Sequence, residues 1–172
     1  MSSDGNEMEP GLLPEQDREI VMADVFISHA AADLPLAEFL HRHLSQEGLS
    51  VYLASVSMPP GERWMPNIMD NLRNSTWVLC LASRSACSSP WVMQEMGDAI
   101  AGNKKLIPII WDQEPEALPG WMKQYQAVNI SGQVQEEAKT AISKIADAIK
   151  TEKQKGLVIL GLLVAGLFAF GK

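Results

Sequence analysis

Cysteine and histidine are scarce in this sequence. Its 172 residues include two cysteines, Cys80 and Cys87, which are too few and too close together for a disulfide framework. Cys80 lies in an apolar run and Cys87 in a serine-rich stretch, so we expect free thiols in a reducing compartment. The three histidines have no carboxylate or thiol partner at the spacing of a metal-binding motif. We therefore expect neither a disulfide-stabilised protein nor a metal centre.

Basic residues are also few. Lysine and arginine number 14 against 21 acidic residues, which gives a formal net charge of −7. A nucleic-acid-binding surface needs clustered lysine and arginine, so this composition excludes that class of function.

Residues 1–20 lack the apolar periodicity of a helix or strand. They are acidic and rich in glycine and proline, which predicts a disordered acidic tail. They also lack the basic stretch and hydrophobic run of a signal peptide.

Five short runs with strand character alternate with helical patterns between residues 22 and 152. The predicted strands are residues 23–28, 51–54, 76–82, 105–110 and 127–130. The predicted helices are residues 33–46, 64–73, 90–101 and 133–153, the first capped by Asp33. This alternation with short links indicates an α/β domain with a central parallel sheet of about five strands and helices on both faces. Pro108 suggests that the fourth strand lies near an edge of the sheet or is unpaired on the side where the proline lacks an N–H.

Polar or small residues follow the first three predicted strands. Ser28 ends the first strand, a Pro-Gly loop at residues 59–61 follows the second, and Ser83 ends the third. Because ligands of such sheets bind at the carboxyl ends of the strands, these features converge on one candidate site.

The helix beginning at Pro90 follows the same edge. Ser89 suits its N-cap and Pro90 its first turn, and Trp91 and Glu95 are then four residues apart on one face. A carboxylate held against an apolar ring can have a raised pKa, which suits a catalytic acid, a base or a group that stabilises a cation. The alternative interpretation is a core tryptophan followed by a solvated glutamate.

Residues 156–171 form a run without any charge. As a helix the run would be roughly 24 Å long, against a hydrocarbon core of about 30 Å, and Lys155 and Lys172 can reach the two interfaces. A buried core helix is the alternative, although a helix that is apolar on every face suits lipid better. We therefore predict a single-pass transmembrane helix at residues 155–172. The lysines before it would keep the domain in the cytoplasm.

Four segments, in this order, resemble motifs of the Toll/interleukin-1 receptor (TIR) domain family. Residues 25–29 (VFISH) resemble its first box, and residues 58–61 (MPPG) followed by Trp64 resemble its BB loop. Residues 89–95 (SPWVMQE) resemble its S-x-W-x-x-x-E segment, and residues 107–111 (IPIIW) resemble the stretch at its fourth strand. The resemblance covers about residues 22–150 and implies the flavodoxin-like TIR fold, which we place at residues 22–152.

TIR domains include non-catalytic adaptors and enzymes that cleave the nicotinamide–ribose bond of NAD. The resemblance aligns Glu95 with the catalytic glutamate of the enzymes, and it implies NAD as a substrate and no cofactor. Trp91 would stack on a planar ring of the nucleotide, Gly61 would let the loop approach it, and Arg63 would meet a phosphate. The candidate substrate-binding residues are Ser28, His29, Gly61, Arg63, Trp64 and Trp91.

The sequence thus suggests a membrane-anchored NAD+ nucleosidase that forms ADP-ribose or a cyclic product. The resemblance further implies activation by self-association, in which the BB loop of a neighbouring subunit completes the active site, and a role in defence signalling. The alternative is a non-catalytic TIR scaffold that binds other TIR domains at the membrane. The Trp91 and Glu95 pair favours the enzyme.

Overall fold

The computed structural model describes residues 22–53, 64–132 and 135–169, and within these ranges it describes all side chains except those of residues 64–66, 135 and 157–169. The acidic tail predicted at residues 1–20 lies outside the described residues.

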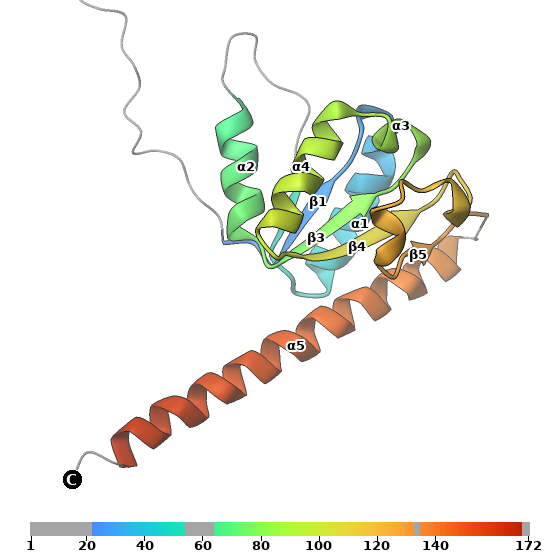
Figure 1. Ribbon diagram of the computed structural model, residues 1–172. Coiled ribbons are helices and arrows are strands. Elements are labelled where there is room, and N and C mark those ends of the chain that lie inside the picture. Colours follow the sequence, from blue (N-terminus) through green and yellow to red (C-terminus); the bar gives the residue numbers. More distant parts are fainter. Residues whose placement is uncertain (1–21, 54–63, 133–134, 170–172) are drawn as a thin grey trace, which may run out of the picture.

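A five-stranded parallel sheet forms the centre of the domain (Figure 1). Its strands are β1 (Val25–Ser28), β2 (Val51–Leu53), β3 (Trp77–Leu81), β4 (Lys105–Ile110) and β5 (Val128–Asn129). They lie in the order β2-β1-β3-β4-β5, and every neighbouring pair is parallel. This confirms the sheet predicted from the alternating pattern. It also brings the ends of β1 and β3 side by side, with Ser28 opposite Cys80.

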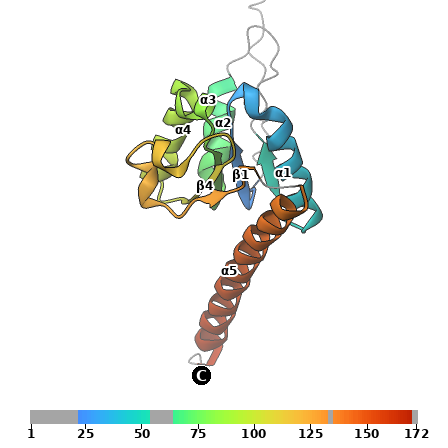
Figure 2. The ribbon, with the colours of Figure 1, turned by 90° about the vertical axis from the view of Figure 1, so that its right-hand side faces the viewer.

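Helices cover both faces of the sheet (Figures 1 and 2). One face packs against α1 (Leu34–Gln46) and α5 (Gln135–Ala169), through a core that includes Leu40, Leu44 and Ile145. The other face packs against α2 (Trp64–Asn74), the short α3 (Arg84–Cys87) and α4 (Pro90–Ala101). Single turns of 3-10 helix lie at η2 (Ala31–Asp33), η3 (Pro115–Ala117) and η4 (Met122–Gln124).

The position of Pro108 agrees with the chemistry of proline. β4 is the strand next to the edge strand β5, which pairs only with Ile109 and Ile110. Proline has no N–H to donate to a neighbouring strand, and the pairing of β4 with β5 begins at Ile109, one residue after Pro108.

The last helix is longer than predicted. Instead of ending near residue 153, α5 continues without a break to Ala169. Its first half is held to the domain by ion pairs, Lys150 with Glu47 at 2.8 Å and Lys153 with Asp24 at 2.7 Å. Within the described residues, no helix is both long and apolar enough to cross a membrane. The transmembrane segment predicted at residues 155–172 falls mainly on side chains outside the described ones, so it stays a prediction.

Candidate active site

Glu95 lies on the buried side of α4, at the edge where the parallel strands end. As predicted, the helix begins with Pro90 in its first turn, and the Ser89 hydroxyl accepts the Val92 N–H at 3.4 Å. Only 7% of the Glu95 surface is exposed, against 47% for Trp91 one turn earlier. This arrangement is the reverse of a core tryptophan with a solvated glutamate. The buried group is the acid, and the aromatic ring is the group open to solvent.

A short hydrogen bond holds the Glu95 carboxyl group. Ser28, the last residue of β1, donates its hydroxyl to Oε2 of Glu95 at 2.5 Å, which joins two positions 67 residues apart. Burial raises the pKa of Glu95 to about 6, because the charged form loses hydration, while the bond from Ser28 lowers it. The carboxyl group therefore changes its charge near pH 6 and is mostly ionised at neutral pH.

The charge of Glu95 affects the pKa values of two further side chains on this face of the sheet. Burial raises the pKa of the Tyr52 hydroxyl, Glu95 raises it further, and Asn71 lowers it. Burial likewise raises the pKa of the Cys80 thiol, with smaller contributions from Cys87, Glu95 and Asp33. Tyr52 also stacks on Phe26 of β1, with ring centroids 5.5 Å apart. The carboxyl group therefore lies over the ends of β1, β2 and β3.

A second buried carboxyl group, that of Asp33, lies in η2, which follows the end of β1. Its Oδ2 accepts the Ser83 hydroxyl at 2.7 Å and the Ala30 N–H at 3.2 Å, and only 1% of the residue is exposed. Asp33 is the N-cap residue of α1, as predicted, but its side chain makes no capping hydrogen bond to that helix. The Asp33 carboxyl group instead binds Ser83, which is 50 residues away and caps α3 by accepting the Ala86 N–H.

His29 is buried next to this pair, with 6% of its surface exposed. Neither ring nitrogen has a hydrogen-bond partner among the described residues. Burial lowers the pKa of the imidazole, and the negative charge of Asp33 opposes that effect. Burial therefore favours the neutral form of the His29 imidazole.

The structure brings together three of the residues predicted from sequence, Ser28, His29 and Glu95, and places Trp91 on the exposed side of the same helix. Gly61 and Arg63 lie outside the described residues. Trp64 is the first residue of α2, but its side chain is not among those described. Sequence analysis did not identify Tyr52 or Asn71 as neighbours of the site, because they come from a strand and a helix with no polar motif.

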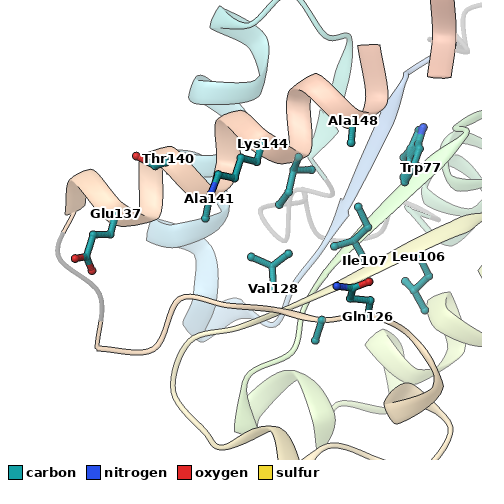
Figure 3. Close-up of a pocket in the computed structure, with 12 residues that line it drawn as sticks. Trp77, Leu106, Ile107, Gln126, Val128, Glu137, Thr140, Ala141, Lys144 and Ala148 are labelled. Atoms are coloured by element: carbon teal, nitrogen blue, oxygen red, sulfur yellow. The ribbon is translucent and has the colours of Figure 1, made fainter. Parts of the chain in front are cut away.

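A hollow lies on the opposite face of the sheet from α4, between α5 and the strands β4 and β5 (Figure 3). It has a volume of about 730 Å³ and a mostly apolar lining that includes Trp77, Ile107, Val128 and Ala141, with Glu137 and Lys144 from α5. We call it the α5 groove. In the described part of the chain, no cluster of three or more histidine, cysteine or acidic side chains is arranged to hold a metal ion.

The fold and the site define an α/β domain with a buried glutamate at the carboxyl edge of a parallel sheet. Residues 25–146 match the family described as the TIR domain, and the chain belongs to that family.

Among known proteins, the chain is similar to a probable 2′ cyclic ADP-D-ribose synthase from Brachypodium distachyon. The two are 33% identical over 97 residues, which are 55% of this chain and 43% of that protein. The chain thus corresponds to less than half of the length of this relative.

Two solved structures share the fold. The TIR domain of a Toll-related receptor from Hydra magnipapillata superposes with a TM-score of 0.61 and 18% identity, over 74% of this chain and 98% of that domain. A metazoan TIR-STING receptor from C. gigas, solved in complex with 2′,3′-cGAMP, gives a TM-score of 0.57 and 22% identity, over 70% of this chain and 39% of the receptor.

Proposed function

We propose that this protein cleaves the nicotinamide–ribose bond of NAD+ and that Glu95 is the catalytic residue. The observation that carries the proposal is the environment of Glu95, a buried carboxyl group with a pKa of about 6 at the carboxyl edge of the sheet. Enzymes place groups with shifted pKa values where they act on a substrate. The similarity to a probable 2′ cyclic ADP-D-ribose synthase supports the same chemistry.

One carboxylate is sufficient for this reaction. When the bond between ribose C1′ and the pyridinium nitrogen breaks, the bonding electrons neutralise the nicotinamide ring, so the leaving group needs no proton. The ribose is left as an oxocarbenium-like cation, which a nearby carboxylate stabilises through its charge or through the ribose hydroxyls. Water then adds to C1′ and releases a proton to give ADP-ribose. Attack by a hydroxyl of the same molecule gives a cyclic product instead.

The exposed ring of Trp91 is suited to hold a planar part of the substrate. It lies one turn before Glu95 on α4, with about half of its surface open to solvent. Stacking of a nucleotide base on an aromatic side chain contributes about 1–3 kcal/mol. Trp91 would therefore supply binding, while Glu95 acts on the ribose.

We further propose that the protein acts as an assembly of several copies, anchored in a membrane through residues 156–171, in defence signalling. The α5 groove supports association, because it leaves apolar side chains such as Trp77 and Ile107 partly exposed on a folded domain. The uncharged composition of residues 156–171 supports the anchor, and the lysines before it support a domain on the cytoplasmic side.

The deciding experiment follows NAD+ during incubation with the full-length protein at high concentration in detergent micelles, with products separated by chromatography. We expect the wild-type chain to release nicotinamide and Glu95→Gln to release none, while circular dichroism shows that both are folded. The second product distinguishes ADP-ribose from a cyclic form. If wild type and Glu95→Gln both leave NAD+ intact, even at concentrations that give assemblies, the protein is a TIR scaffold.

A further inference from the structure

Ser28 occupies a rigid and fully buried position in the candidate site. It ends β1, which lies between β2 and β3, and none of its surface is exposed. It lies in register with Cys80, on the face of the sheet that α4 covers. The position of its hydroxyl is therefore set by the sheet and does not depend on a loop.

The one hydrogen that the Ser28 side chain can donate is committed to one partner. A hydroxyl has a single proton, and Ser28 donates it to Oε2 of Glu95 at 2.5 Å. One oxygen of the Glu95 carboxyl group, Oε2, is thus held by a residue of the central sheet.

We propose that Ser28 is a positioning residue, which holds Oε2 of Glu95 so that Oε1 faces the substrate, and that Ser28 itself does not touch the substrate. This inference rests on the proposed function of Glu95 and replaces the sequence-based prediction that Ser28 binds substrate directly. An isolated carboxyl group can rotate and exchange its two oxygens, whereas the bond from a fixed strand selects one orientation.

The same bond favours the ionised form of Glu95. A donor that binds a carboxylate stabilises its charge, and here it opposes the effect of burial. The other titratable groups that face Glu95 come from β2 and β3, and they are Tyr52 and Cys80. Both are neutral near pH 6, because burial raises the pKa of each. His29 follows Ser28 at the end of β1, and Asp33 lies in η2, where its carboxyl group is bound by Ser83. Ser28 is thus the hydrogen-bond donor that opposes the burial of Glu95.

Ser83 provides a matched control. It is also a fully buried serine at the carboxyl edge, and it also donates its hydroxyl to a buried carboxyl group, but to Asp33 in place of Glu95. Ser28→Ala and Ser83→Ala therefore each remove a buried hydroxyl that donates to a carboxyl group, and Ser83→Ala also removes the cap of α3. Ser28→Cys keeps most of the volume but replaces the hydroxyl by a weak donor, and so it separates loss of the bond from loss of packing.

The first test measures NAD+ cleavage by the full-length variants between pH 5 and pH 9. For Ser28→Ala and Ser28→Cys, we expect the acidic midpoint to rise by about one pH unit, because one charged hydrogen bond is lost. The resulting loss of kcat would be about fivefold greater at pH 6 than at pH 8.5, with KM unchanged. The Ser83→Ala midpoint should stay at the wild-type value. An unchanged midpoint in both Ser28 variants, or an equal rise in Ser83→Ala, would overturn the inference.

A second test does not depend on catalysis. In protein labelled with ¹³C at the glutamate carboxyl groups, the Glu95 signal is assigned by its absence in Glu95→Gln and titrated by NMR. The inference requires the Glu95 pKa to rise in the Ser28 variants and not in Ser83→Ala. If neither the wild type nor any variant cleaves NAD+ but the Glu95 pKa moves as expected, the proposed function fails, whereas the hydrogen bond between Ser28 and Glu95 remains established. If the pKa does not move, the positioning role fails.

Discussion

The burial of Glu95 should make the wild-type protein less stable than its Glu95→Gln variant at neutral pH. The pKa of Glu95 is raised from 4.5 to about 6 in the folded protein. A raised carboxyl pKa means that the folded state binds the proton more tightly than the unfolded state. The effect on stability is therefore favourable in acid and is lost as the pH rises through 6. Glutamine cannot ionise, keeps a similar size and retains an oxygen that accepts the Ser28 hydroxyl.

The size of the effect follows from the difference between the two pKa values. At about 1.36 kcal/mol per pKa unit, a rise of about 1.5 units corresponds to about 2 kcal/mol at pH 7 and above. The same relation gives less than about 0.5 kcal/mol at pH 4, where the carboxyl group is protonated in both states. For a domain of this size, 2 kcal/mol corresponds to an increase in Tm of roughly 4–8 °C. The amide group of glutamine also has to find a hydrogen-bond partner, so the calculated increases in stability and Tm are upper bounds.

Thermal unfolding followed by circular dichroism at pH 4 and pH 7.5 measures this difference. We expect Glu95→Gln to raise the Tm at pH 7.5 and to leave it nearly unchanged at pH 4. Glu114→Gln makes the same chemical change on an exposed side chain and serves as the control. A Glu95→Gln variant that is less stable than wild type at pH 7.5, or whose Tm rises equally at pH 4 and pH 7.5, would refute the argument from burial.

Two further substitutions test binding and assembly. Trp91→Ala should raise the KM for NAD+ by about tenfold and change stability by less than about 0.5 kcal/mol, because the ring is half-exposed. A clear fall in Tm with an unchanged KM would show a packing role instead. Ala148→Arg places a charge at an exposed position of α5 in the α5 groove. By sedimentation, it should remain monomeric at concentrations where wild type associates, and identical sedimentation of the two would exclude the α5 groove as the contact.

Local patterns were sufficient to predict most of the sheet and the start of α4. The strands could be predicted because buried parallel strands are short apolar runs, and Ser89 with Pro90 marks a helix start by local chemistry alone. The sequence does not predict the short helix α3, because its four residues lie in a serine-rich stretch without helical periodicity. From the pattern alone, its cap, Ser83, marks only the end of a strand.

The features missed in the site depend on tertiary contacts. Asp33 stands where a helix cap is expected, but a serine 50 residues away binds its carboxyl group instead. The burial of Glu95 did leave a signal in the sequence. Val92, Glu95, Met96 and Ala99 have helical spacing, and all four are buried on one side of α4. An acidic residue inside such an apolar stripe could have been predicted to be buried.

The order of the strands has a consequence for how the site comes into being during folding. β1 pairs with β3, and its last residue binds a helix 67 positions later in the chain. Contacts between such distant segments form late, because a long loop must close before they contribute any energy. The first half of the polypeptide therefore contains Ser28, His29 and Asp33, but the candidate site is not complete without the second half. Catalytic competence would be acquired in the last steps of folding, and recovery of activity during refolding would report completion of the whole sheet.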